Sequence, residues 1–189
     1  LTKNEMMISE IWCPEKTVEI TGEGYKPEGK FLINKNEIDA KTKEAVSLML
    51  KVGALCTNAN LESKGNEYSI IGDPTEGAIV VAAAKMGMDK TRLEAEFKRE
   101  YEIPFSSERK MMTTINIRER KRMSCVKGAT EVVTNLCENI MVDGRPARMT
   151  NSLKEKIIQQ NLEMASKALR VLAIAYKEMP SAEKEAAEK

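Results

Sequence analysis

The sequence predicts an α/β fold, in which a twisted antiparallel sheet of about six or seven strands is flanked by helices. Short segments with alternating apolar residues, separated by turn residues, indicate antiparallel strands between positions 102 and 126. Stretches with apolar residues at helical spacing stand before and after these segments. Hairpins with helices between them favour an α/β sandwich over a doubly wound parallel sheet.

The first half of the chain is expected to contain strands and helices in turn. Residues 17–21 alternate and predict a strand, and residues 68–71 predict another. From position 38 to about 58, apolar residues recur at helical spacing. A second helix is predicted over 74–86, because Asp73 suits its N-cap, Pro74 its first position and Gly87 its C-terminal cap.

The second half begins with a predicted short helix over 93–100. The elements predicted after it are the strands Glu102–Phe105, Met111–Ile117 and Met123–Val126, a helix over Ala129–Cys137, a hairpin over 140–149, a long helix capped by Asn151 or Ser152, and a closing strand Val171–Tyr176. The tail that follows carries no long-range apolar signal.

Composition argues against several classes of function. The 189 residues suit one domain, and 30 basic against 29 acidic side chains give a net charge of +1, which is no electrostatic footprint for nucleic acid. The one basic run, 118–122, is interpreted as a solvated hairpin turn. Without histidine, and with four widely spaced cysteines, a zinc site and histidine-dependent nucleophiles are disfavoured. No apolar run approaches the roughly 20 residues that span a bilayer. We expect a monomer without direct membrane contact.

Residues 101–130 contain the strongest candidate site. Phe105 stands beside a turn that leads to Lys110, and Lys127 follows about two strands later. An exposed aromatic ring can stack on a base, and each ammonium group can contact phosphate. The same residues also fit a core ring and two surface lysines, and spacing alone favours the core for Phe105.

Three further candidates also have structural explanations. Gly128 removes a side chain beside a lysine, and a helix predicted after Ala129 could favour an anion through its free N–H groups. Glu76 has the spacing of a capping box with Asp73, in which its carboxylate bonds back to the Asp73 N–H, or it accepts from the exocyclic amine of a base. Arg170 complements a helix dipole or binds phosphate, and the residues alone favour the dipole.

Five segments between residues 56 and 176 resemble, in order, the nucleotide-binding domain of P-type cation-transporting ATPases. They are CTNANL (56–61), GDPTEGA (72–78), PFSSERKMM (104–112), VKGATE (126–131) and RVLAIAY (170–176). Within that family they resemble the calcium pumps of the sarco/endoplasmic-reticulum and bacterial kind, and the wording GDPTEG favours the bacterial kind. Residues 1–6 resemble those that follow the phosphorylated aspartate of the family's DKTGTLT motif.

The resemblance implies a role for each candidate residue at the base and phosphate ends of a nucleotide. Phe105 would stack on adenine, and Glu76, with Thr75, would line the adenine end. Lys110 and Lys127 would both sit at the pocket, with Lys127 deeper.

The remaining roles concern the pocket floor and the phosphates. By the same resemblance, Gly128 and Ala129 would form the floor, and Arg170 would reach phosphate or ribose. One position departs from the family's pattern: animal calcium pumps often have arginine two places after the phenylalanine, where this chain has Ser107. Whether the nearby Arg109 compensates is left open.

The resemblance also implies the activity of a parent protein. ATP would be held here and its γ-phosphate delivered to the aspartate of a phosphorylation domain in an ATP-driven calcium pump. The aspartate is expected before Leu1, so this chain should bind nucleotide without being catalytic. Mg²⁺ would come with the nucleotide and be held mainly by other parts of the parent. The partners would be the phosphorylation and actuator domains, and the location the cytoplasmic side of an integral membrane protein.

The domain boundaries follow from the same comparison. Residues 1–10 are expected to be a hinge or lead-in, 11–178 the nucleotide-binding domain and 179–189 a second hinge or tail. Two alternatives stay open, namely a pump for another cation and a non-catalytic interaction module that uses some of the 12 methionines as a surface. A self-contained enzyme is disfavoured, because no set of acid and base groups converges.

Overall fold

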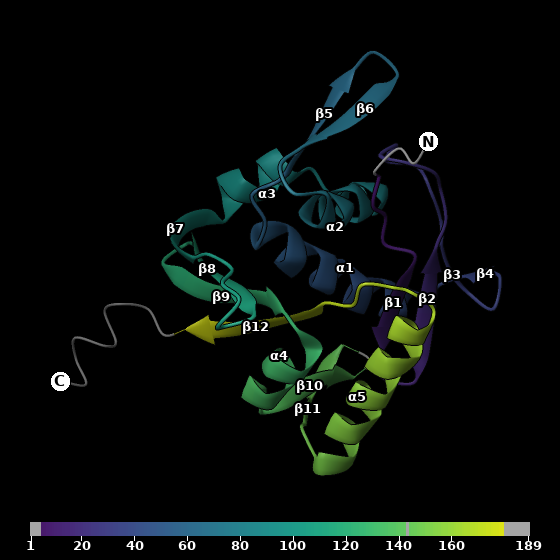
Figure 1. Ribbon diagram of the computed structural model, residues 1–189. Helices are drawn as coiled ribbons and strands as arrows, with labels where there is room; N and C mark the ends of the chain where they lie inside the picture. The colour runs from purple at the N-terminus through teal and green to yellow at the C-terminus, as the bar shows by residue number, and fades with distance from the viewer. Residues whose placement is uncertain (1–4, 143, 180–189) are drawn as a thin grey trace. The chain divides into compact units, whose positions relative to one another are not determined.

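The structure, a computed structural model, describes residues 5–142 and 144–179 (Figure 1). It divides into two compact units, and each is described by itself. The first unit contains residues 1–93 and 141–146, and the second contains 94–140 and 147–189. The dividing line passes within one short helix and within one hairpin.

The first unit contains a four-stranded antiparallel sheet with a hydrophobic core against it. Its strands pair in the order β1 (Glu10–Cys13), β2 (Lys16–Ile20), β3 (Phe31–Ile33) and β4 (Asn36–Glu37). Two-residue turns join β1 to β2 and β3 to β4, and Glu15, Asn34 and Lys35 at these turns have positive φ, whereas a longer loop joins β2 to β3. The core side chains of this unit include Val18 from the sheet and Val46 and Leu50 from the first helix.

Two helices of the first unit begin at aspartate caps. Asp39 accepts a hydrogen bond from the Thr42 N–H at the start of α1 (Ala40–Leu55). Asp73 caps α2 (Pro74–Lys85), and the two helices pack against each other. An N-cap aspartate satisfies N–H groups that have no partner in the first helical turn. α3 (Lys90–Glu96) is shorter and lies at the boundary between the units.

A two-stranded ribbon extends beyond α2 in the first unit (Figure 1). It consists of β5 (Asn60–Lys64) and β6 (Glu67–Ile71), joined at Gly65, whose φ is 64°. Its base packs closely on α2: a Cβ built on Gly77 would lie 2.6 Å from Ile70 Cγ2. Glycine at position 77 therefore lets the ribbon approach the helix.

The second unit contains another four-stranded antiparallel sheet, with a helix packed on two of its strands, β9 and β12. Its strands pair in the order β12 (Ala173–Met179), β9 (Lys121–Gly128), β8 (Met111–Arg118) and β7 (Lys98–Ile103). α4 (Thr130–Leu136) packs on β9, β12 and α5 (Asn151–Ser166). The Thr130 hydroxyl donates to Asn161 Oδ1 at 3.0 Å and ties the two helices together. A small hairpin, β10 (Asn139–Val142) and β11 (Arg145–Arg148), stands between α4 and α5 in the chain.

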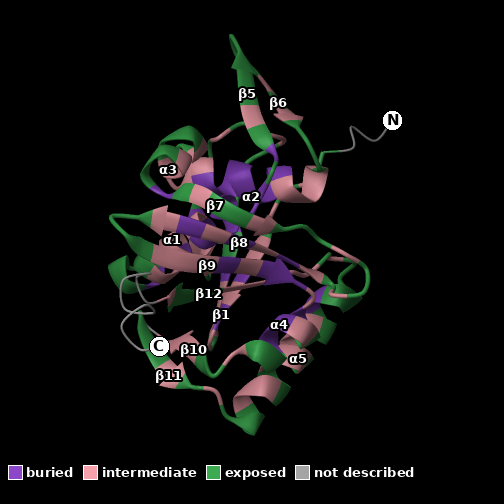
Figure 2. Ribbon diagram, turned by 90° about the vertical axis from the view of Figure 1, so that its left-hand side faces the viewer, coloured by how far each residue is buried: buried purple, intermediate pink, exposed green. Residues whose placement is uncertain are grey.

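Burial alternates along β8, as expected where the two faces of a strand differ (Figure 2). Met112, Thr114 and Asn116 are buried, whereas the residues between them are partly exposed. Thr114 stands opposite Cys125 of β9, so the buried face continues onto the neighbouring strand.

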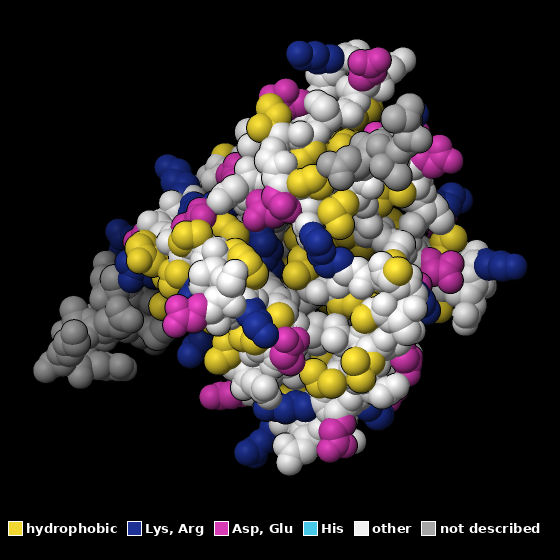
Figure 3. Space-filling view, in the orientation of Figure 1, with side chains coloured by type: hydrophobic (Ala, Val, Ile, Leu, Met, Phe, Trp, Pro, Cys, Tyr) yellow, Lys and Arg dark blue, Asp and Glu magenta, His cyan; other side chains and the backbone are white. Residues whose placement is uncertain are grey.

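The predicted α/β fold, with antiparallel sheets flanked by helices, is confirmed. The single sheet of about six or seven strands was wrong: the described strands form separate sheets of four, two, four and two strands. Hydrophobic alternation predicts strands but does not predict which of them pair. The helices predicted over 38–58 and 74–86 are confirmed as α1 and α2, and Gly87 with φ 83° follows the end of α2 as predicted. The basic run 118–122 contains the turn between β8 and β9, as interpreted. On the face shown in Figure 3, acidic and basic side chains are interspersed.

Some sequence predictions were wrong in detail. The helix predicted over 93–100 ends at Glu96, and β7 already begins at Lys98 because pairing with β8 overrides the helical preference of its charged residues. The cap of α5 is Thr150, whose hydroxyl accepts from the Leu153 N–H, and not Asn151 or Ser152. Strands β1, β3, β4 and β5 were not predicted, since they are short and depend on cross-strand pairing. The predicted boundaries 11–178 stay a prediction, and residues 1–4 and 180–189 of the predicted hinges lie outside the described residues.

Candidate functional site

Phe105 lies just after β7 with its ring open to solvent. It is 59% exposed, so the interpretation of Phe105 as a core residue is wrong. The strand predicted to end at Phe105 ends at Ile103. An exposed phenyl ring can present a face for stacking, which a buried one cannot.

The loop from Phe105 to Lys110 is held by its own hydrogen bonds. The Lys110 N–H donates to the Ser106 carbonyl at 2.7 Å, and the Arg109 N–H donates to Ser106 Oγ at 3.2 Å. Lys110 has a φ of 52°, in the left-handed region that costs a residue with a side chain about 1–2 kcal/mol. Ser107 is exposed in this turn.

Lys110 connects this loop to the segment VKGATE through its backbone. The Ala129 N–H donates to the Lys110 carbonyl at 2.9 Å. Gly128 permits this approach, because a Cβ there would lie 2.5 Å from the Lys110 oxygen and 2.5 Å from Met111 Cβ. The Lys110 ammonium is exposed and lies 3.9 Å from Glu131 Oε1. The glycine thus has a packing reason within the sheet, independent of any ligand.

Lys127 differs from Lys110 in its burial. It lies in β9, is only 6% exposed and stands opposite Met112 on β8 and Ile174 on β12. Most lysines are solvated at the surface, so a lysine at this depth is uncommon. It shares the face of Met112, whereas the neighbouring Thr113 lies on the opposite face of the sheet.

Arg170 stands in the connection between α5 and β12 and is exposed. α5 ends at Ser166, so Arg170 lies beyond the last helical turn. A contact with the helix dipole is strongest within that turn and weakens outside it. The strand that follows it pairs Ala173 with Gly128. Three of the family-like segments, PFSSERKMM, VKGATE and RVLAIAY, therefore contribute neighbouring strands β8, β9 and β12 of one sheet.

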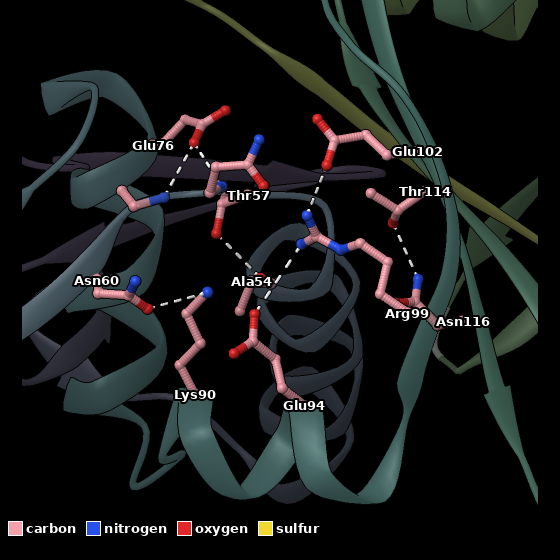
Figure 4. Close-up of polar contacts among 12 residues, drawn as sticks. Ala54, Thr57, Asn60, Glu76, Lys90, Glu94, Arg99, Glu102, Thr114 and Asn116 are labelled. Carbon is pink, nitrogen blue, oxygen red and sulfur yellow. Dashed lines mark hydrogen bonds and ion pairs between the residues drawn. The ribbon is translucent and has the colours of Figure 1, made fainter.

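Thr75 and Glu76 lie in the first unit, at the start of α2. Asp73 Oδ1 accepts from the N–H groups of both residues. Glu76 Oε2 accepts from the backbone N–H groups of Asn58 at 2.6 Å and Ala59 at 3.1 Å (Figure 4). The predicted Asp73 cap is thus present, and the Glu76 carboxylate also holds the CTNANL segment on α2. Sequence reasoning missed this tie, because the partners are backbone groups far away in the chain.

The polar groups of β7 and β8 near these segments bind one another. In the second unit, Arg99 donates to Glu102 at 2.9 Å and lies 4.0 Å from Glu94, and the Asn116 amide donates to Thr114 at 2.9 Å (Figure 4). Within the described residues, no cluster of three or more cysteine or acidic side chains is arranged to hold a metal ion. In the same part of the chain, none of the helices has the length and apolar character to cross a membrane.

Comparison with known proteins decides the family. Residues 45–189 match the family described as P-type ATPase, cytoplasmic domain N. The chain belongs to this family. The resemblance inferred from the five segments is thereby confirmed, and with it the N-domain fold.

Relatives of this N domain include several named pumps. It is 39% identical over 184 residues to a calcium-transporting ATPase of Bacillus subtilis, and the aligned region covers 97% of this chain and 21% of that protein. It is 33% identical over 183 residues to the cation-transporting ATPase pma1 of Synechocystis sp., with coverages of 94% and 20%. It is 32% identical over 180 residues to the human calcium-transporting ATPase type 2C member 1, with coverages of 93% and 19%. The N domain therefore spans about a fifth of the length of these relatives.

Proposed function

We propose that this N domain binds ATP through its adenine end and presents the γ-phosphate to the phosphorylation domain of a calcium-transporting P-type ATPase. The observation that carries this proposal is the exposed ring of Phe105, held by a loop whose last residue is bonded to the VKGATE segment. A domain that holds the nucleotide while another supplies the aspartate fits in-line phosphoryl transfer, in which positioning provides most of the catalysis.

The proposed nucleotide-binding residues are divided between the two units. In the second unit they are Phe105, Lys110, Lys127, Gly128, Ala129 and Arg170. In the first unit they are Thr75 and Glu76, which would line the adenine end. Mg²⁺ would come with the nucleotide, and its protein ligands would belong mainly to other parts of the parent. The phosphorylation and actuator domains would be the partners, on the cytoplasmic side of a membrane.

The experiment is an NMR titration of the N domain with ATP, ADP and AMP. One aromatic stack and a few partly exposed ionic contacts suggest a Kd of roughly 0.1–1 mM. Both Phe105 and Lys127 should shift on titration. Phe105→Ala should weaken binding of all three nucleotides by a similar factor, about 5- to 150-fold, because the lost stacking of about 1–3 kcal/mol concerns the shared adenine.

Two results would contradict the proposal. The first is that Phe105 and Lys127 both stay unshifted at saturating ATP. The second is that Phe105→Ala weakens ATP but not AMP, because the ring would then not be the stacking residue. Leu136→Ala is the matched control, since it removes an equally exposed apolar side chain elsewhere in the second unit.

A pump for another cation is the alternative, since relatives of this N domain include proteins named only as cation-transporting ATPases. Nucleotide titration does not separate the two, because the ion is chosen elsewhere in the parent. Transport of ⁴⁵Ca²⁺ into vesicles by the complete parent protein would do so.

A further inference from the structure

One nitrogen of the Arg109 guanidinium has no hydrogen-bond partner in the described part of the chain. Its Nη2 donates to Thr113 Oγ1 at 3.1 Å, whereas its Nη1 is buried and has no hydrogen-bond partner among the described residues. No carboxylate of the described chain pairs with it. Buried polar atoms are nearly always satisfied, and a cation taken out of water needs an anion beside it.

Other arginines of the same unit show what is missing at Arg109. Arg99 pairs with Glu102, Arg118 pairs with Glu96, and Arg122 pairs with Glu100 through two bonds of 2.7 and 2.8 Å. This unit therefore supplies carboxylates to these guanidinium groups and supplies only a neutral hydroxyl to Arg109.

The position of Arg109 places this charge near the ring of the candidate site. Arg109 belongs to the same loop as Phe105, and its acceptor Thr113 pairs with Ile103 across the strands. Phe105 follows Ile103 by two residues, which span at most about 7 Å of extended chain. Lys110 follows Arg109 directly, so two positive charges stand at the end of the loop.

We propose that Arg109 is an anion-binding residue and that it takes a phosphate group of the nucleotide whose base stacks on Phe105. This inference rests on the proposed function. Arg109 then supplies the second cation of the loop, at a different position from the arginine that Ser107 replaces. A guanidinium suits this role because it can donate two parallel hydrogen bonds to one phosphate.

In this proposal, Thr113 Oγ1 accepts the hydrogen bond of the Arg109 guanidinium while no nucleotide is bound. Thr113 and Lys127 lie on opposite faces of the sheet, and Nη1 is closed off from solvent. The side chain must therefore turn away from Thr113 toward the end of the strand before it meets a phosphate. Removal of the Thr113 hydroxyl should then leave ATP binding unchanged or strengthen it, because it removes a competing acceptor.

The test measures binding of adenosine, AMP, ADP and ATP by isothermal titration calorimetry at fixed ionic strength. Arg109→Gln should leave the adenosine Kd unchanged and should raise the ATP Kd by about 5- to 10-fold, the expected loss of one partly exposed charged contact. Arg109→Lys should recover part of that loss, and Thr113→Val should bind ATP at least as well as the original chain. Arg120→Gln, at the exposed turn of β8 and β9, is the matched control and should change neither constant.

Several outcomes overturn the proposal. If Arg109→Gln weakens adenosine and ATP equally, or if Thr113→Val weakens both, Arg109 only holds the loop in place. If Arg109→Gln binds ATP as well as the original chain does, Arg109 does not contact phosphate. Failure of the proposed function is distinct: the unaltered N domain would then bind neither adenosine nor ATP, and the inference would fall with it.

Discussion

Some residues of this N domain adopt a backbone conformation that their side chains disfavour. Ala168 follows the C-cap of α5, Lys167, with a φ of 61°, at a position where glycine is usual. Its N–H donates to the Ala165 carbonyl at 2.9 Å, and the Leu169 N–H donates to the Met164 carbonyl at 3.3 Å. These two bonds define a Schellman motif, whose strained position is occupied by alanine.

Ala168→Gly should therefore stabilise the N domain. Relief of the left-handed strain is worth about 1 kcal/mol, less a part for the added freedom of the unfolded chain. The midpoint of urea unfolding should rise without a change in its slope. Ala165→Gly, one turn earlier in the same helix, is the control and should destabilise by about 0.5–1 kcal/mol. A fall in the midpoint for Ala168→Gly would contradict the strain.

The Glu76 carboxylate should contribute to stability even without nucleotide. Glu76→Ala would leave the backbone N–H groups of Asn58 and Ala59 without this acceptor, and Ala59 is fully buried, so the loss should be about 1–3 kcal/mol. Glu76→Gln keeps an acceptor without the charge and should cost about half as much. Urea unfolding of both variants checks this order, and equal stability of Glu76→Ala and the original chain would exclude the tie.

At the scale of the elements, the contact between β8 and β9 joins two segments of the proposed site. Gly128 has no special φ, so its requirement is steric: a Cβ would meet the backbone of Lys110 and Met111. The bond from the Ala129 N–H to the Lys110 carbonyl depends on this approach. The spacing of the residues in the sequence indicated a glycine beside a charge, but not which backbone it faces.

Gly128→Ala should push β8 and β9 apart at this end. Overpacking of this kind costs about 1–3 kcal/mol, and the Ala129 amide should lose protection against hydrogen exchange. Gly65→Ala in the β5–β6 turn is a useful comparison, because its positive φ is strained but nothing lies within 4 Å of the added methyl group. Unchanged protection of the Ala129 amide in Gly128→Ala would contradict the steric role.

At the scale of the whole molecule, the N domain has two compact units, each with buried side chains of its own. The ring and the lysines of the proposed nucleotide site lie in the second unit. A ligand that binds the folded chain but not the unfolded chain must stabilise the folded chain by mass action.

ATP should therefore raise the unfolding temperature. At a concentration about ten times the Kd, the gain is about 1.4 kcal/mol, which corresponds to about 3–6 °C for a chain of this size. Adenosine at the same multiple of its own Kd should give a similar shift, whereas inorganic phosphate at that concentration should give less. Differential scanning calorimetry measures all three, and no shift with saturating ATP would contradict nucleotide binding.

The sequence by itself determined the fold class, the long helices and the family. Helical spacing and the Asp73, Pro74 and Gly87 signals are local, so α1 and α2 could be predicted from neighbouring residues alone. The five segments identified the family for the same reason, because each is a contiguous stretch.

Only the tertiary structure decided the exposure of Phe105, the burial of Lys127 and the partners of Glu76 and Arg109. Pairing of β9 with β8 and β12 places Lys127, and the approach of residues 58 and 59 to α2 gives Glu76 its partners. Phe105 and Arg109 lie in a loop, and the spacing of apolar residues does not predict the exposure or the partners of loop side chains. The short strands β3 and β4 were missed because they depend on cross-strand pairing. Local interactions thus specify the helices and the longer strands, whereas the short strands, side-chain exposure and pairing depend on what packs against them.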